Sequence, residues 1–159
     1  MKKNSTNPWI LTKKFNKKYP GHFETVFTLA NKYTGMRGYF GFSPFACEPG
    51  YYMAGLFNKT PYFKSEPVNI PAPFNYALII KGEKADIMKN RIISATHTLD
   101  MKRGVLINEA VVMDRKKNRT SIKEERFLHI KYKELAVQRV TITPLNYSGS
   151  GFIMNTLDL

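Results

Sequence analysis

The chain has 159 residues, 43% hydrophobic and 13% aromatic, which is the size and composition of one domain with a buried core. It carries 25 Lys and Arg against 12 Asp and Glu, a net charge of +13, and a single cysteine, Cys47. These features exclude an internal disulfide, and the sequence lacks the run of about 20 apolar residues that a membrane-spanning helix needs.

The N-terminal 22 residues are polar and basic, so they do not resemble a secretory signal, and we expect a cytoplasmic protein. Pro8, Pro20 and Gly21 disfavour a helix there. This part of the chain is therefore predicted to be an extended arm, docked by Trp9 and Phe15.

Residues 23–38 are predicted to form a strand that enters a turn. Gly35 and Gly38 flank Met36-Arg37 and would permit a tight bend. Glu24 and Arg37 are single opposite charges beside apolar residues, and we expect them to pair with each other or with backbone groups.

Residues 39–75 are rich in glycine, proline and aromatic residues, which predicts ordered loops with little regular structure. Cys47 lies there among apolar neighbours and is interpreted as structural and inert.

From residue 75 onward the sequence is typical of β-structure. Ile122, Leu128, Ile130 and Tyr132 occupy even positions and are expected on one face of a strand. Residues 85–93 fit either a strand or one short helix. Strands are predicted at 76–80, 105–113, 121–132, 135–143 and 152–157, joined by turns at 81–83, 114–119 and 144–151.

This succession of strands predicts an all-β fold, an antiparallel β-sandwich. The chain stops within its last predicted strand, so we expect it to be part of a longer protein. Basic clusters at the N-terminus and at residues 115–119 are interpreted as solvated, and no motif of a common RNA- or DNA-binding module is present, so we expect no nucleic-acid partner.

No catalytic or metal site is recognisable from residue types and spacing. His22, His97 and His129 lack ligand-type spacing, and no phosphate-binding glycine motif occurs, so no metal or cofactor is predicted. Two carboxyl groups flanking one bond would suit glycoside hydrolysis, but nothing selects a pair among the candidates by type, Glu24, Glu48, Glu66 and Asp100.

Six stretches, in the same order along the chain, resemble the N-terminal domain of glycoside hydrolase family 65, which includes maltose, trehalose and kojibiose phosphorylases. The opening stretch holds Trp9, Leu11 and Phe15. The sequence departs from the family pattern at Ala30 and Lys32, which stand where glycines are favoured. The other matching residues are Glu24, Asn31, Arg37 and Gly38, then Tyr52 and Gly55, Asn69, Asp100 and Gly104, and Arg126.

The resemblance implies a large, many-stranded β-sandwich, of which residues 1–159 would cover roughly the first half. Family chemistry resides in a separate (α/α)6 barrel outside the matched region, so no catalytic residue is carried over. The implied function is a non-catalytic domain that supports this catalytic barrel and a homodimer in an enzyme acting on α-glucosyl disaccharides. A loop within residues 30–45 or 49–57 would then help to shape the pocket entrance.

Two alternatives remain open at the level of sequence. The chain could be a stand-alone basic module that binds carbohydrate or a polyanion. It could also be a half-sandwich that pairs its open sheet edges with a second copy.

Overall fold

The computed structural model describes residues 7–43, 48–62, 64–155 and 157; Cys47, predicted to be inert, lies outside them. The described chain is all-β, as expected, with antiparallel strands and one short helix, α1 (Pro20–Val26). The strands are β1 (Ile10–Lys14), β2 (Leu29–Ala30), β3 (Thr34–Met36), β4 (Tyr51–Asn58), β5 (Glu66–Asn69), β6 (Tyr76–Ile80), β7 (Glu83–Lys84), β8 (Arg91–Asp100), β9 (Val105–Met113), β10 (Arg119–Leu128), β11 (Ala136–Pro144) and β12 (Gly151–Asn155).

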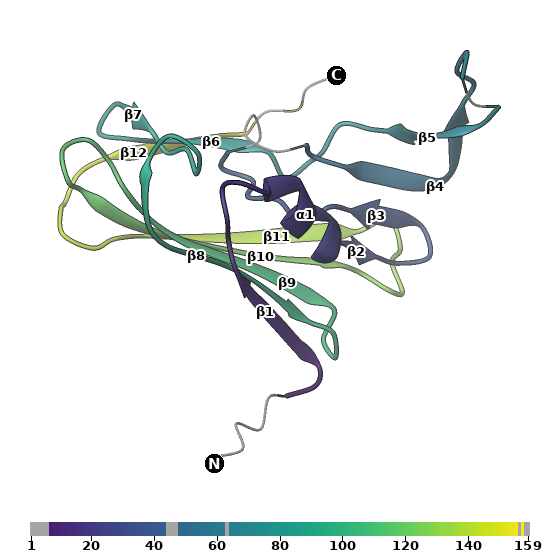
Figure 1. The fold of residues 1–159 in the computed structure, drawn as a ribbon, viewed down its shortest axis with the longest axis horizontal. Coiled ribbons are helices and arrows are strands. Elements are labelled where there is room, and N and C mark those ends of the chain that lie inside the picture. Colours follow the sequence, from purple (N-terminus) through teal and green to yellow (C-terminus); the bar gives the residue numbers. More distant parts are fainter. Residues whose placement is uncertain (1–6, 44–47, 63, 156, 158–159) are drawn as a thin grey trace.

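The strands form three sheets arranged in two layers (Figure 1). One layer is a five-stranded sheet with the order β1-β8-β9-β10-β11. The other layer contains a three-stranded sheet, β12-β6-β7, and a four-stranded sheet, β2-β3-β4-β5. Along β9 and β10, buried positions alternate with more exposed ones, because one face of the five-stranded sheet packs against the opposite layer.

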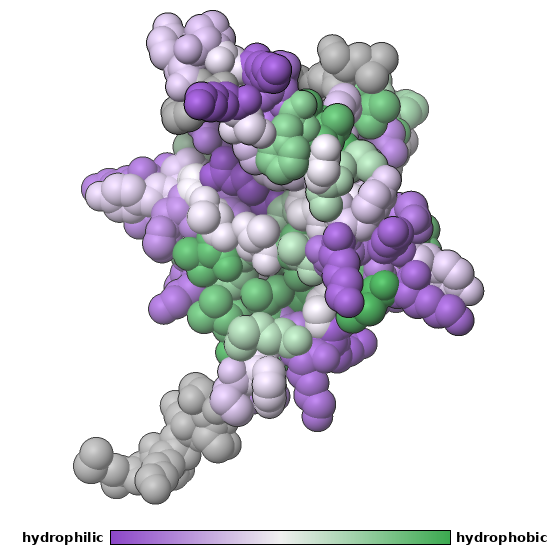
Figure 2. Space-filling model, turned by 90° about the vertical axis from the view of Figure 1, so that its right-hand side faces the viewer, coloured by the Kyte–Doolittle hydropathy of each residue, from purple (hydrophilic) through white to green (hydrophobic). Residues whose placement is uncertain are grey.

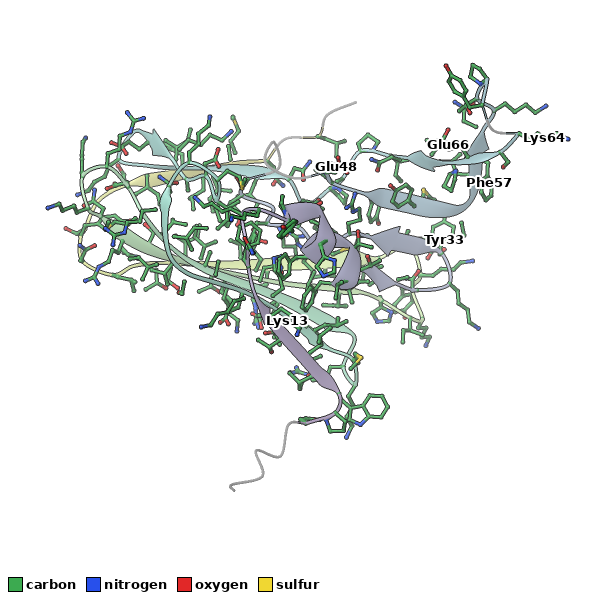
Figure 3. The ribbon with its side chains drawn as sticks, viewed as in Figure 1. Lys13, Tyr33, Glu48, Phe57, Lys64 and Glu66 are labelled. Carbon is green, nitrogen blue, oxygen red and sulfur yellow. The ribbon has the colours of Figure 1, made fainter. Side chains whose placement is uncertain are left out.

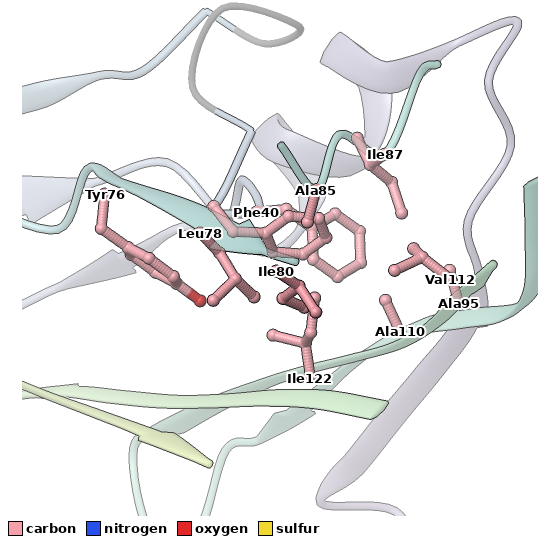
Figure 4. Packing of buried hydrophobic residues seen from close by; sticks show 11 residues of the cluster. Phe40, Tyr76, Leu78, Ile80, Ala85, Ile87, Ala95, Ala110, Val112 and Ile122 are labelled. Carbon is pink, nitrogen blue, oxygen red and sulfur yellow. The ribbon is translucent and has the colours of Figure 1, made fainter. Parts of the chain in front are cut away.

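One hydrophobic core fills the space between the five-stranded and three-stranded sheets (Figure 4). β6 contributes a nearly continuous buried run, as predicted for residues 76–80. The segment before the β4–β5 ribbon adds two phenylalanines to this core. The main members of this first core are Phe40, Phe42, Tyr76, Leu78, Ile80, Ile87, Val112 and Ile122.

A second core lies under α1 and the four-stranded sheet. Phe27, at the end of α1, is fully buried there, and Phe23 packs beside it one helical turn earlier. Positions four apart share one face of a helix, so α1 turns its aromatic side toward this core. The other buried members include Leu29, Met36, Tyr39, Tyr51, Phe74, Leu106 and Leu128.

Most strands predicted for the C-terminal half are present, but most of β8 was not predicted. The strand predicted at 121–132 ends at Leu128, so the placement of Ile130 and Tyr132 on its face is wrong, and both lie exposed in the following loop. The strand predicted at 105–113 has those bounds in the structure, and the predicted turn at 81–83 joins β6 to β7. Lys81 and Gly82 both have positive φ, 49° and 80°, which suits a two-residue hairpin. Residues 85–93 were expected to form a strand or one short helix. Residues 91–93 do begin strand β8, whereas residues 85–90 form a compact loop held by Asp86 and Asn90.

The extended course predicted for the N-terminal arm is seen in β1, whereas the predicted absence of a helix is wrong. β1 is an edge strand of the five-stranded sheet, paired with β8, and Pro20 begins α1 instead of preventing it. Proline suits the first turn of a helix, where its missing N–H has no intrahelical partner. Phe15 packs against the first core as expected, whereas Trp9 is 54% exposed and does not dock the arm.

The prediction of a strand and then a bend across residues 23–38 is also wrong. Residues 23–26 belong to α1, and the tight connection falls at Asn31–Tyr33, between β2 and β3, instead of at Gly35–Gly38. Gly35 lies within β3, paired with Ala30 and Tyr52. The predicted pairing of Glu24 with Arg37 is confirmed.

The prediction of mostly irregular structure across residues 39–75 is wrong for the β4–β5 ribbon. Its prolines lie at the loop and in the outer strand, where a missing N–H costs no bond inside the sheet. No helix in the described residues is long and apolar enough to cross a membrane.

Candidate functional site

The structure distributes the ten residues singled out by sequence over four separate places. None of these places gathers all of them, so the sequence pattern does not describe one active site. The four groups are Glu24, Arg37 and Gly38 beside α1; Asn31, Tyr52, Gly55 and Asn69 in the four-stranded sheet; Asp100 and Gly104 at the β8–β9 turn; and Arg126 in the core.

Glu24 and Arg37 fasten α1 to the chain that follows β3. Glu24 is 2% exposed, and its carboxylate lies 3.4 Å from the Arg37 guanidinium. Arg37 also pairs with the exposed Glu48 at 3.3 Å and donates a hydrogen bond to the carbonyl of Gly21. The arginine thus joins three segments, and its role in the structure is to hold the helix in place.

Gly38 allows the backbone to pass directly beneath α1. Its N–H donates to the Glu24 carbonyl at 2.8 Å, and a Cβ at this position would lie 2.4 Å from the carbonyl oxygen of Phe27. No side chain fits at that separation, so the glycine is required by close packing and not by a bend.

Asn31 joins the β2–β3 hairpin to the loop between β10 and β11. Its side-chain oxygen accepts hydrogen bonds from the N–H groups of Tyr33 and Thr34, which closes the hairpin. Its amide nitrogen donates to the carbonyls of His129 and Lys133 at 2.9 and 3.0 Å. One side chain therefore fixes two loops that are far apart in sequence.

The β4–β5 ribbon extends away from the body of the sandwich (Figures 1 and 3). Asn69 secures its base by accepting from the N–H of Tyr51 and donating to the carbonyl of Pro49. Tyr52 is half-buried in β4, beside Asn69 of β5. Gly55 has a φ of 84° and lies where the pairing register shifts between Tyr52 and Phe57. This bulge gives the outer half of the ribbon its own direction.

The outer half of the ribbon exposes large apolar side chains: Leu56 is 40%, Phe57 58% and Tyr62 89% exposed. At the same end, the loop after β10 exposes three more. Figure 2 views the molecule from this side and shows hydrophobic side chains in separate patches, the largest of them low on the face. The residues Leu56, Phe57, Tyr62, Ile130, Tyr132 and Leu135 are called the apolar end below.

The third group forms an ordinary turn. The Asp100 carboxylate accepts the N–H of Arg103 at 3.0 Å, and Gly104 has a φ of 64°, which explains why an acid and a glycine flank the β8–β9 connection. This turn shows no chemistry beyond its local structure.

Arg126 belongs to a fully buried polar network that sequence reasoning did not recognise. Its guanidinium lies 2.9 Å from the Glu124 carboxylate and donates to the carbonyl of Tyr39 at 2.7 Å. Glu124 also accepts from the hydroxyl of Tyr76 and from the N–H groups of Gly41 and Phe42. Burial, and then the neighbouring Glu124 charge, raise the pKa of the Tyr76 hydroxyl, so Tyr76 stays a neutral donor.

Asn108 and His97 extend this network under α1. Asn108 donates to the Tyr39 carbonyl and contacts His97 Nδ1 at 2.8 Å. His97 is packed among the rings of Phe23, Phe27 and Phe40, and burial lowers its pKa to about 4. Since Glu124, Arg126 and His97 are at most 1% exposed, they position the chain and cannot reach a ligand.

A signal for the network was present in the sequence. The even positions of β10 run Thr120, Ile122, Glu124, Arg126, Leu128, and the apolar members already mark the inward face. A Glu and an Arg two apart on that face predict a buried pair, because a buried charge needs a partner. Among the described residues, no group of three or more His, Cys, Asp or Glu could hold a metal ion.

Known proteins with similar sequences include kojibiose and maltose phosphorylases. The sequence model of glycosyl hydrolase family 65, N-terminal domain, matches residues 10–159. A kojibiose phosphorylase from Caldanaerobacter subterraneus subsp. tengcongensis is 34% identical over 149 residues, 94% of this chain and 19% of the relative. A maltose phosphorylase from Bacillus subtilis is 34% identical over 139 residues, 79% of this chain and 18% of that relative.

A solved structure of a protein provisionally assigned as a kojibiose phosphorylase from the human microbiome has the same fold. Its TM-score is 0.76 at 20% identity, covering 87% of this chain and 20% of that one. The chain thus spans about one fifth of the length of the relatives it matches.

Proposed function

Because the chain belongs to the glycosyl hydrolase family 65 N-terminal domain family, we propose that it is a non-catalytic part of an α-glucoside phosphorylase and docks its apolar end on a catalytic barrel. The observation that carries this proposal is the apolar end itself. It exposes large side chains on segments that the side chains of Asn31 and Asn69 tie to neighbouring backbone. Preorganised, rigid apolar anchors are what a stable domain interface needs.

The charged groups that could serve glycoside chemistry support a non-catalytic role. Of the four acids considered by type, Glu24 is buried against Arg37 and Asp100 caps a turn. The other two are exposed: Glu48 pairs with Arg37, and Glu66 lies on the separate β4–β5 ribbon. Acid–base hydrolysis or phosphorolysis needs carboxyl groups on both sides of an accessible bond. We therefore expect the isolated chain to release no glucose 1-phosphate from kojibiose, maltose or trehalose with phosphate. Turnover of any of them by the purified chain would contradict the proposal.

Docking can be tested in a chimera in which this chain replaces the matching first fifth of the Caldanaerobacter kojibiose phosphorylase. We expect Phe57→Asp with Tyr62→Asp to lower the kojibiose phosphorolysis of the chimera by about 10-fold or more, since burying two unpaired charges costs several kcal/mol. The isolated chain with the same changes should keep its melting temperature, because both positions are exposed.

A matched control changes charge at the opposite end of the sandwich. Arg115→Asp with Lys117→Asp alters two exposed loop residues, and the chimera should then keep its activity. Equal loss in both variants, or none in the apolar-end variant, would show that the apolar end is not the docking surface.

The proposal includes a homodimer of the complete protein. In the chain itself, β12 is the outermost strand of the order β12-β6-β7, and Phe152, Ile153 and Met154 are more than half exposed on it. An open strand edge can pair with a second copy. Light scattering at two protein concentrations measures whether the isolated chain associates, and a fixed monomer mass would remove this edge from the dimer proposal.

The alternative of a stand-alone carbohydrate module leads to a different result. It predicts that the isolated chain binds glucans with an affinity insensitive to salt, whereas docking on a barrel predicts no glucan binding by the isolated chain.

A further inference from the structure

The end of the sandwich opposite the apolar end is strongly basic. Figure 1 shows β7, the start of β8 and the β9–β10 hairpin together at this end, and Figure 3 shows nitrogen-tipped side chains projecting from it. Register supports the placement, since Arg91 of β8 pairs with Met113 of β9, and Met113 pairs with Arg119 of β10. We call this region the basic end, comprising Lys81, Lys84, Lys89, Arg91, Arg115, Lys116, Lys117 and Arg119.

Two adjacent grooves open at the basic end and share Arg91 and Met113. One has a volume of about 420 Å³ and is also lined by Lys84, Lys89 and Arg115. The other measures about 410 Å³ and is also lined by Lys117 and Arg119. Both volumes fall in the range of small-molecule sites, about 300–1,000 Å³.

Acidic residues offset little of this charge. Asp86 accepts hydrogen bonds from two backbone N–H groups and from Ser43, and Asp114 accepts from the N–H and the side chain of Asn118. These two carboxylates are committed to their own loops. Glu83 is the remaining acid on the groove walls.

Hydrogen bonds hold two of the segments that form the groove walls. Lys17 donates to the carbonyls of Met88 and Asn90 and so closes the loop before β8. Asn146 accepts from the N–H of Arg119 and donates to the carbonyl of Lys117, which holds the β9–β10 hairpin. A rigid frame lowers the ordering cost of binding at its surface.

We propose that the basic end binds a small anion with two or more phosphate groups, one held in each groove. Arg91, shared by both grooves, would contact the ligand at its centre, and Arg115 and Arg119 would contact its two ends. Arginine suits this task because its planar guanidinium donates two parallel hydrogen bonds to a phosphate. A single phosphate could engage only one groove, so its affinity should be lower.

The lining favours a small polyphosphate-type ligand over nucleic acid. Proteins that hold single strands combine cations with aromatic rings on which bases stack. The described residues lining these two grooves include no aromatic side chain. The site therefore offers charge recognition without a stacking platform.

The test is calorimetric titration of the chain with inorganic tripolyphosphate at low and moderate salt. We expect saturable binding that weakens as salt rises, and orthophosphate weaker by about 10-fold or more. Arg91→Gln with Arg115→Gln should weaken tripolyphosphate binding by about 10-fold or more. Amide NMR shifts should move within residues 83–91 and 113–119.

The control removes the same charge elsewhere. Lys102→Gln with Arg103→Gln alters two exposed cations at the β8–β9 turn, the far end of those strands, and should change affinity less than about 3-fold. If tripolyphosphate binding weakened equally in both variants, the net charge of the chain would explain the binding, and the proposal would be overturned. Orthophosphate binding as tightly as tripolyphosphate, or an oligo-dT binding more tightly at equal phosphate, would overturn it too. This result is independent of whether the apolar end docks on a barrel.

Discussion

At each end of the sandwich an asparagine side chain holds a hairpin in place, but the exposed side chains are apolar at one end and basic at the other. At the apolar end, Asn31 fixes the β2–β3 hairpin against the loop after β10, and at the basic end Asn146 fixes the β9–β10 hairpin against the loop after β11. Outside these ties, one end exposes Phe57 and Tyr62, while the other exposes Arg91 and Arg115.

Positioning the hairpins and binding a partner are done by different residues, which lie interspersed along the sequence. Polar side chains that bond to backbone set the position of the hairpins, and the outward side chains set what the hairpins can bind. The family-motif residues belong almost entirely to the first task, whereas the proposed binding surfaces use residues outside the motifs. Predictions on either task can therefore be tested without disturbing the other.

If one rigid core joins the two ends, disrupting its buried polar network should have the largest effect on stability. Arg126→Met disrupts this network. It leaves the Glu124 carboxylate buried without its cation. We expect the free energy of unfolding to fall by about 3–5 kcal/mol, because a buried charge that loses its partner keeps its desolvation cost. Urea unfolding measures the change.

The control for that variant is Glu125→Gln, which breaks ion pairs with Lys123 and Arg139 on the exposed face of the same strand. Its cost should stay below about 1 kcal/mol. A similar loss from the two substitutions would mean that the buried network does not join the ends.

Acid should loosen α1, and with it the base of the apolar end, through His97. The folded pKa is about 4, lowered by burial from an ordinary 6.5, so the unfolded chain binds the proton more readily. Stability is therefore full above about pH 6.5, falls as the pH drops toward 4, and loses about 3 kcal/mol over that window. His97→Gln should remove this part of the pH dependence in unfolding measured from pH 7 to 4. An unchanged slope would contradict the assignment.

Close packing beneath α1 should distinguish two glycines of one segment. Gly38→Ala places a Cβ 2.4 Å from the Phe27 carbonyl, whereas at Gly35 the nearest atom is 3.9 Å away. We expect Gly38→Ala to destabilise the chain by about 1–3 kcal/mol and Gly35→Ala to change stability by less than about 0.5 kcal/mol. Melting temperatures of the two variants, measured side by side, check this, and equal values would refute the packing argument.

The two asparagine ties give the smallest expected difference. Asn31 makes four hydrogen bonds to backbone groups and Asn146 makes two. Asn31→Ala should cost about 1–3 kcal/mol and Asn146→Ala about 0.5–1.5 kcal/mol, in proportion to the partners left unsatisfied. Hydrogen exchange should rise in the β2–β3 hairpin for the first and in the β9–β10 hairpin for the second. If either variant raised hydrogen exchange equally in both hairpins, the assignment of one asparagine to each end would be contradicted.

Local pattern predicted most strands of the C-terminal half but not most of β8, the ten-residue strand between β1 and β9. β9 was predicted with its observed bounds because apolar and β-branched residues dominate residues 105–113. α1 was missed because Pro20 and Gly21 suggest a break, and only packing of Phe23 and Phe27 on a distant sheet makes a seven-residue helix stable.

The candidate site could be predicted only in fragments. The pairing of Glu24 with Arg37 follows from nearby opposite charges, but the partners of Asn31 lie 98 and 102 residues away, where no local pattern points. The basic end is likewise assembled from distant segments. Sheet register places residue 113 between residues 91 and 119, and residue 84 of the other layer lines the same groove as residue 91.

The Glu124–Arg126 pair also restricts how this chain can diverge over evolutionary time. An apolar pair of similar volume would be compatible with the same fold. Replacing the pair one residue at a time passes through a variant with one buried, unpaired charge. That variant would lose a large part of an ordinary free energy of unfolding of about 5–15 kcal/mol. A single change at either position should therefore be strongly destabilising, whereas a paired apolar replacement should be compatible with the fold.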